Sequence, residues 1–219
     1  MSKIGKSLRI SSNFLIIGAL ALFLRALGPF AYQELSYVAT KAWNRGWQLN
    51  TSAASETAPK PLQAVITRRP LTLQPVNAES SIVIEKIGVS APIVINVDAD
   101  DSAEYKEALK EGVAHASGSA LPGSPGNTFL FAHSSLNFWE LGKYATVFNL
   151  LGKLEAGDPI ILFYKNKRFD YEVIDKRIVP GFNTLPLLRQ TTLPVLTLQT
   201  CTPPGTTINR LIVTAKAVE

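Results

Sequence analysis

The chain contains a single cysteine, Cys201, within the segment TLQTCTPPGTTINRLIV that runs from Thr197 to Val213. An apolar, β-favouring run leads into the cysteine, a Pro-Pro-Gly turn follows, and a second β-favouring run begins at Arg210. One cysteine cannot form an internal disulfide, so it is a buried small hydrophobe, an interchain link or a reactive thiol. A strand end next to a loop is a place where a thiol can be presented to a substrate.

His133 and Arg210 would complete the set of groups that a cysteine nucleophile needs. The thiol must become a thiolate, the leaving group must be protonated, and the developing oxyanion needs a hydrogen-bond donor. An imidazole such as that of His133 can carry the proton, since its usual pKa is about 6.5. Arg210 is permanently charged, its field favours a thiolate, and its planar fork can bind an oxyanion or carbonyl. Taken singly, each residue also fits an ordinary structural role.

Short β-favouring runs separated by turns surround these three residues. The expected strands are residues 81–89, 91–97, 128–133, 158–164, 168–179, 195–201 and 210–218. Residues 102–112 predict a short helix with a serine cap and a glycine stop, and residues 144–154 indicate a helical turn or two. Seven or eight strands with little helix predict a mostly β fold, either a barrel or a sandwich. Because His133, Cys201 and Arg210 each lie at a strand end, they can meet on one rim.

Residues 14–32, FLIIGALALFLRALGPFAY, form an apolar stretch with one charge, Arg25. As a helix the stretch would span roughly 28 Å, close to the hydrocarbon core of about 30 Å. A central arginine costs about 2.5–3.5 kcal/mol and each Leu, Ile or Phe returns about 0.3–0.6 kcal/mol, so insertion is marginally favourable. We favour a membrane anchor with a cytoplasmic N-terminus over a cleaved signal peptide or an interfacial helix. All three alternatives place the following domain at a membrane or outside the cytoplasm.

The sequence divides into three parts of different composition. Residues 1–50 are expected to hold a cytoplasmic tip, the transmembrane anchor and a juxtamembrane helix, and residues 51–77 are a linker rich in Ser, Ala, Thr and Pro. Residues 78–219 form the expected catalytic domain. The net charge of +5 belongs to residues 1–50, whereas residues 51–219 carry 16 basic and 16 acidic side chains. A neutral domain argues against nucleic-acid binding, and one cysteine with two histidines argues against a structural zinc site.

Five segments between residues 81 and 218 resemble, in order, those of the sortases, the transpeptidases of bacterial cell surfaces. TLQTC, followed by Arg210 at the start of the last strand, is similar to the sortase pattern T-L-x-T-C. GNTFLFAH, which ends in His133, is similar to the passage that precedes the histidine of the family. The other matching segments are IEKIGVSAPIV, KEGVAHASGSALPGSPGN and FNLLGKLEAGDPIILFY.

The resemblance implies a closed β-barrel of about seven to eight strands with short helices, and it implies roles for individual residues. Cys201 would attack the Thr–Gly carbonyl of an LPxTG-like sorting signal and form a thioacyl enzyme, which an amine resolves. His133 would act as general acid and then as general base, and Arg210 would hold the substrate carbonyl or oxyanion. Thr200 is a further candidate for substrate binding. The implied partners are surface proteins with such a signal and a cell-wall or protein amine; no cofactor is expected.

Two other functions remain open at this point. One is a sortase-fold peptidase that mainly hydrolyses its thioacyl intermediate, and the other is an anchored binding domain without activity. No Asp-Pro-aromatic lid precedes the domain, so the pilin-polymerising type is not expected. The loop before the histidine strand also lacks the acidic cluster of calcium-activated members, and Glu104 and Glu107 are expected on a solvated helix face.

Two further expectations concern residues outside the proposed triad. His115 falls in the loop before the histidine strand and is expected to be structural. The connection Pro180–Pro194 corresponds to the sortase loop that packs over the sorting signal. Its residues Leu185, Leu187 and Leu188 form either an apolar wall of the binding site or part of the core.

Overall fold

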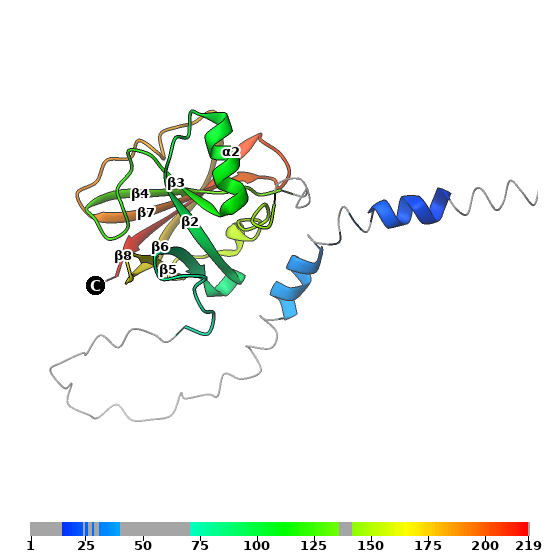
Figure 1. The fold of residues 1–219 in the computed structure, drawn as a ribbon, viewed down its shortest axis with the longest axis horizontal. Helices are drawn as coiled ribbons and strands as arrows, with labels where there is room; N and C mark the ends of the chain where they lie inside the picture. Colours follow the sequence, from blue (N-terminus) through cyan, green and yellow to red (C-terminus); the bar gives the residue numbers. More distant parts are fainter. Residues whose placement is uncertain are drawn as a thin grey trace, which may run out of the picture.

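The computed structural model describes residues 15–23, 25, 28, 31–39, 71–135 and 142–218, and its main body is a closed β-barrel (Figure 1). The strands are β1 (Ser80–Ile84), β2 (Val89–Val97), β3 (Val113–Ala116), β4 (Gly126–Phe131), β5 (Pro159–Tyr164), β6 (Lys167–Pro180), β7 (Pro194–Thr202) and β8 (Asn209–Ala217). Around the barrel they follow the order β1-β2-β3-β4-β7-β8-β6-β5. The expectation of a mostly β, closed barrel with short helices is therefore confirmed.

The alternation of apolar side chains along the strands fills the barrel. Leu130 of β4, Leu196 and Leu198 of β7, and Leu211 and Val213 of β8 all belong to the buried core. Since successive side chains of a strand point to opposite faces, the residues at the alternate positions of these strands point outward. Cys201 and Arg210 are in this second set, so the fold directs both away from the barrel interior.

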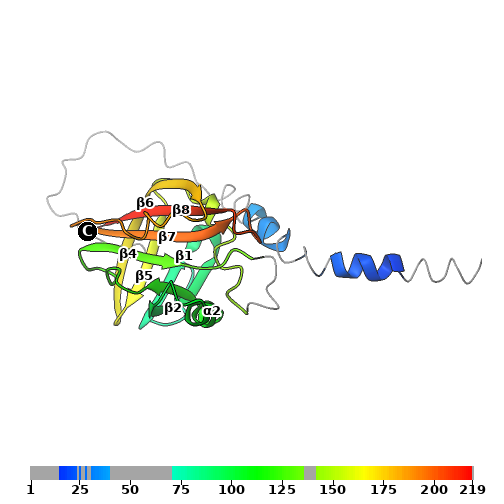
Figure 2. The same cartoon turned by 90° about the horizontal axis from the view of Figure 1, so that it is seen from above.

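The pairing of β4 with β7 brings the ends of these strands together. The two strands are parallel, with Phe129 opposite Thr197 and Phe131 opposite Gln199. Parallel strands finish at the same edge of a sheet, so the residues after β4 and the last residues of β7 lie at one rim. β8 is antiparallel to β7 and therefore begins at that rim. Figures 1 and 2 show β4, β7 and β8 running side by side.

Helix α2 (Ser102–Glu111) packs on β2 and β3, on one side of the barrel (Figures 1 and 2). Its N-cap is Asp101, not the expected Ser102. The Asp101 carboxylate accepts the backbone N–H groups of Ala103 at 2.8 Å and Glu104 at 3.2 Å. A carboxylate satisfies two free N–H groups and opposes the positive end of the helix dipole, which explains why it serves as the cap. The helix ends before Gly112, as expected.

Three local features differ from the expected elements. The expected strand 81–89 is interrupted by a 3-10 helix, η1 (Glu85–Ile87), which closes at Gly88 with a φ of 66°. His115 and Ala116, which the sequence placed in a loop, belong to strand β3, whose four buried residues pair with β2 and β4. The helical turns expected in residues 144–154 are turns followed by a 3-10 helix, η2 (Leu151–Lys153).

The expected strands 158–164 and 168–179 form a β-hairpin. β5 and β6 pair from Pro159 and Glu172 to Tyr164 and Lys167, which leaves a two-residue turn. Lys165 and Asn166 have φ values of 50° and 61°. Two consecutive positive φ angles are characteristic of the type I′ turn that suits the twist of a hairpin.

The described part of the N-terminal region is helical at residues 15–23 and 31–39. Among the described residues, no helix combines the length and the apolar character that crossing a membrane requires. The membrane anchor at residues 14–32 therefore stays a prediction, and most of the predicted linker lies outside the described residues. Residues 31–39 contact the barrel: the Gln33 amide donates to the Thr146 hydroxyl at 2.9 Å, and Lys153 pairs with Glu34 at 2.9 Å.

Candidate active site

Cys201 and Arg210 are direct cross-strand partners. The register of β7 and β8 places Cys201 opposite Arg210, with Thr202 opposite Asn209 one step further on. Opposed residues of an antiparallel pair have their side chains on the same face, with Cβ atoms about 4.5–5.5 Å apart. The pairing therefore places Arg210 next to Cys201 on the same face of the sheet.

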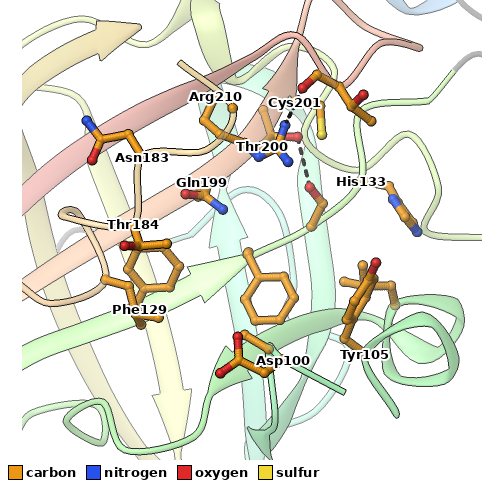
Figure 3. Close-up of a pocket in the computed structure, with 17 residues that line it drawn as sticks. Asp100, Tyr105, Phe129, His133, Asn183, Thr184, Gln199, Thr200, Cys201 and Arg210 are labelled. Atoms are coloured by element: carbon orange, nitrogen blue, oxygen red, sulfur yellow. Dashed lines mark hydrogen bonds between the residues drawn. The ribbon is translucent and has the colours of Figure 1, made fainter. Parts of the chain in front are cut away.

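His133 lies two residues beyond β4 and not at its last position. The chain continues along β7 after the strand ends, because the N–H of Ala132 donates to the carbonyl of Gln199 at 3.1 Å. Extending the register by two residues brings His133 level with Cys201. The structure thus places all three predicted site residues at one rim of the barrel (Figure 3).

Thr200 points to the opposite face from Cys201 and is 3% exposed. Its hydroxyl donates to the carbonyl of Ala132 at 2.9 Å, which is one of the dashed contacts in Figure 3. Ala132 precedes His133 just as Thr200 precedes Cys201, so this bond fixes the distance between the two strand ends. The direct role for Thr200 in substrate binding stays a prediction. The structure shows a hydrogen bond from Thr200 that links β7 to the residue before His133.

A cleft of about 370 Å³ contains these residues. Its floor consists of the outward-facing residues of β4 and β7, including Phe129, Phe131 and Gln199. Helix α2 supplies one wall through Tyr105, and the connection after β6 supplies the other through Thr184. The rings of Tyr105 and Phe131 pack in a T-shaped arrangement, with centroids 6.5 Å apart and planes at 73°. The cleft therefore has aromatic side chains in its floor and Cys201 among its lining residues.

The aromatic residues of this cleft were not among the predicted site residues. Phe129 and Phe131 alternate with Leu130 in the run TFLF, so the sequence did contain a signal that both lie on the face opposite the core. Tyr105 carries no such signal, because one aromatic residue on a short helix is consistent with simple packing. Only the position of α2 beside β4 shows that its ring borders the cleft.

The three leucines of the connection between β6 and β7 were expected either to line the binding site or to belong to the core. Leu187 lines the cleft, which agrees with an apolar wall. Leu185 is 70% exposed and Leu188 is 65% exposed, so neither is part of the core. Pro186 is the buried residue between them. The expectation that this connection borders the site therefore applies to Leu187 alone among the three.

The charge state of the site is governed by burial and by the arginine. Burial lowers the pKa of His133 below its usual value of 6.5, because a half-buried imidazolium loses hydration. The imidazole is therefore predominantly neutral at neutral pH. Arg210 supplies a fixed positive charge, and its Nη1 donates to the carbonyls of Thr207 at 3.1 Å and Asn209 at 3.4 Å. These bonds hold the guanidinium against the β7–β8 loop.

Gly181 leaves room for that arginine. A Cβ atom at this position would lie 2.5 Å from the carbonyl oxygen of Thr207 and 3.4 Å from Nη1 of Arg210. The N–H of Gly181 also donates to the carbonyl of Ile208 at 2.9 Å. The end of β6 and the β7–β8 loop are thus packed closely enough that only a residue without a side chain fits between them.

His115 has the structural role expected for it. The side chain is 1% exposed, and its Nδ1 accepts the backbone N–H of Asn96 at 3.2 Å. Nε2 therefore carries the proton and donates to the carbonyl of Ala120 at 3.0 Å. Burial lowers the pKa of His115, and the bond to Ala120 opposes this shift. The ring joins the end of β2 to the loop before β4, outside the cleft.

We expect His115→Ala to lower the free energy of unfolding by on the order of 2–4 kcal/mol, because it leaves a cavity and unpaired backbone groups. The folded variant should keep most of its activity. Since the folded state lowers the pKa of this imidazole, its contribution to stability is complete above the unfolded pKa of about 6.5 and is lost as the pH falls below it. Denaturant unfolding at several pH values should show a weaker acid destabilisation in the variant than in the wild type. An unchanged pH dependence would contradict this role.

Acidic residues near the site do not form a metal centre in the described part of the chain, where no group of three or more His, Cys, Asp and Glu side chains could hold an ion. Glu104 and Glu107 are exposed on α2, as expected for a solvated face. Glu107 pairs with Lys110 at 2.6 Å, and the carboxylate of Glu104 accepts the N–H of Asp98 at 3.1 Å.

The sequence of the barrel domain matches a known family. The Sortase domain family matches residues 82–218, which is most of the described barrel. The chain belongs to the sortase family. The catalytic roles of Cys201, His133 and Arg210 in this sortase domain stay predictions.

Individual sortases share about a third of the sequence of this domain. Sortase D of Bacillus subtilis (strain 168) is 31% identical over 134 residues, covering 60% of this chain and 59% of the relative. Sortase C-1 of Actinomyces oris has a TM-score of 0.54 at 32% identity and covers 66% of this chain and 76% of its own. For sortase A of Corynebacterium diphtheriae the TM-score is 0.54 at 30% identity, and the match covers 65% of this chain and 61% of the sortase A chain. The chain thus spans less than two thirds of the length of its curated relative.

Proposed function

We propose that this sortase domain is a cysteine transpeptidase that cleaves an LPxTG-like sorting signal and transfers the acyl part to a cell-surface amine. The observation that carries the proposal is the placement of Cys201, Arg210 and His133 on one cleft, with the first two as direct cross-strand partners. A binding domain without activity would not need a nucleophile, a proton carrier and an oxyanion donor at one point.

In the first half of the reaction, the thiol proton of Cys201 passes to His133, Sγ forms a bond to the Thr carbonyl carbon, and the Thr–Gly C–N bond breaks. His133 gives its proton to the departing Gly amine, and a thioester remains on Cys201. In the second half, an amine attacks the thioester carbonyl and gives a proton to His133, which restores the thiol as the new amide forms. Arg210 donates hydrogen bonds to the oxyanion in both halves.

Burial lowers the pKa of His133, so its imidazole is mainly neutral at neutral pH. The reactive thiolate–imidazolium form is then a minor population at neutral pH. The field of Arg210 favours the thiolate within that population. The apolar surfaces of Phe129, Phe131 and Leu187 suit the Leu-Pro part of the signal, which has no charge to solvate.

The proposal is tested by product analysis with an LPxTG-like peptide, with and without triglycine or a diaminopimelate-type amine. Transfer predicts a new amide product that grows with amine concentration. Hydrolysis alone would support the alternative of a sortase-fold peptidase, and no cleavage of any such peptide would support the alternative of a silent binding domain.

Arg210→Lys is expected to slow thioacyl formation by about 10²–10³, which is the usual effect of losing one oxyanion donor. Lysine keeps the charge but loses the planar fork that the carbonyls of Thr207 and Asn209 hold in place. Single-turnover kinetics with a fluorogenic peptide would measure the rate. Arg189→Lys, at an arginine outside this cleft, is the matched control. A rate for Arg210→Lys within about threefold of wild type would show that charge alone suffices.

The proposal extends to location: a single-pass membrane protein with its catalytic domain outside the cytoplasm. Support comes from the helical residues 15–23, whose large side chains face solvent. Leu15 is 75% exposed, and Ile16, Ile17, Leu20, Leu22 and Phe23 are each more than half exposed. Such a surface is costly in water and favourable in lipid. Membrane fractionation of the full chain, with protease accessibility of the domain, tests this placement.

A further inference from the structure

Asn127 and Thr197 form a buried polar pair on the outward face of β4 and β7. Their side chains are 5% and 1% exposed. The hydroxyl of Thr197 donates to Oδ1 of Asn127 at 2.7 Å. In the register of these strands Thr197 lies opposite Phe129, so Asn127 and Thr197 are diagonal neighbours on the face that also carries Cys201.

The other end of the Asn127 amide reaches the connection between β6 and β7. Its Nδ2 donates to the carbonyl of Pro186 at 3.1 Å. Pro186 is the one buried residue in the described segment 181–193. The nearby side chains of Leu185 and Leu188 are mostly exposed. The amide therefore ties the middle of an otherwise exposed segment to the barrel, next to the cleft residue Leu187.

Both functional groups of Asn127 are used in one chain of bonds, Thr197 to Asn127 to Pro186. A primary amide is suited to this place because it accepts at Oδ1 and donates at Nδ2, and a carboxylate would offer only acceptors. The bond from Thr197 leaves Nδ2 as the group that faces the Pro186 carbonyl. The chain of bonds thus connects the two strands that lead to His133 and Cys201 with the wall of the cleft.

We propose that Asn127, oriented by Thr197, is a positioning residue that holds the Thr184–Leu187 wall of the cleft for substrate binding. It contacts neither the thiol nor the imidazole, so it acts on affinity and not on the chemical step. The inference rests on the proposed function, because affinity is defined for the sorting-signal peptide. The order of the wall in the free protein is a separate property that needs no substrate.

Asn127→Asp removes the donor, and Thr197→Val removes the hydroxyl with little change of shape. Each variant should raise KM for an LPxTG-like peptide by about five- to tenfold, as expected for losing a buried hydrogen bond that supports binding, with kcat nearly unchanged. Thr197→Ser keeps the hydroxyl and should restore the KM of the wild type. Labelling of the Cys201 thiol by a methanethiosulfonate reagent should proceed at the wild-type rate in all variants.

Thr128→Val is the matched control, because Thr128 is a buried neighbour on the same strand that points into the barrel. Amide hydrogen exchange is the second measurement. The amides of Leu187 and Leu188, which donate to the carbonyl of Thr184, should exchange faster in Asn127→Asp and Thr197→Val but not in Thr128→Val.

The proposal is overturned by a lower kcat at unchanged KM, by an equal effect of Thr128→Val, or by unchanged exchange at Leu187 and Leu188. If the wild type cleaves no LPxTG-like peptide, the proposed function fails. The exchange experiment then decides on its own whether Asn127 holds the wall.

Discussion

Cys201→Ala is expected to lower peptide cleavage to the background rate while the barrel stays folded. The change removes one sulfur atom from a partly exposed residue near the end of β7, so few packing contacts are lost. Without the thiol no thioester can form, and neither His133 nor Arg210 can replace it as nucleophile. Cleavage of a fluorogenic LPxTG-like peptide measures the effect, and thermal unfolding checks the fold.

Two further observations make this result specific. A methanethiosulfonate reagent should inactivate the wild type and should have no target in Cys201→Ala, since the chain has a single cysteine. Cys201→Ser should also be almost inactive, because a hydroxyl ionises far less readily than a thiol. Full activity in the alanine variant would end the assignment of Cys201 as nucleophile.

His133→Ala is expected to remove nearly all activity as well, because it removes the imidazole that protonates the departing amine in the proposed mechanism. General acid–base catalysis contributes about 10²–10⁴ in rate. His115→Ala, the matched control for removal of an imidazole, should keep most of the activity of the folded enzyme. Equal losses in the two variants would mean that the proton donor is misassigned.

The pH profile of kcat/KM gives an independent check of this pair. It should be bell-shaped, with limbs that belong to the thiol–imidazole pair as a whole. Burial lowers the pKa of His133, so the apparent pKa of the acid limb should lie below 6.5, the usual pKa of an imidazole. The pH profile of the residual activity of His133→Ala should lack this acid limb. An acid limb well above 6.5 would contradict the environment that the structure gives to His133.

Much of the site could be predicted because it depends on strand ends. The β-favouring runs before Cys201 and after Arg210 predicted two neighbouring strands, and their antiparallel pairing then placed the two residues opposite each other. The run that ends near His133 was predicted as a strand too. The parallel pairing of β4 with β7 was not visible in the sequence, because parallel partners are distant in the chain and leave no local turn signal.

The rest of the cleft depends on tertiary packing. Tyr105 borders it only because α2 lies across β2 and β3, and nothing in the helix sequence selects that placement. The second half of β3, His115 and Ala116, was predicted as loop, whereas the structure holds it in the sheet between β2 and β4. Asn127 stands in a motif that the resemblance used only to locate His133, and its bond to Pro186 depends on a segment about 59 residues away.

The measurement that tests the central claim most directly is intact-mass spectrometry of the enzyme during turnover of an LPxTG-like peptide. The account predicts a covalent adduct whose mass equals the peptide up to its Thr acyl group, located on Cys201 by fragmentation. Addition of triglycine should discharge the adduct and yield the peptide–triglycine amide. Peptide cleavage without any adduct on Cys201, or an adduct that persists in Cys201→Ala, would contradict a thioacyl mechanism at this cysteine.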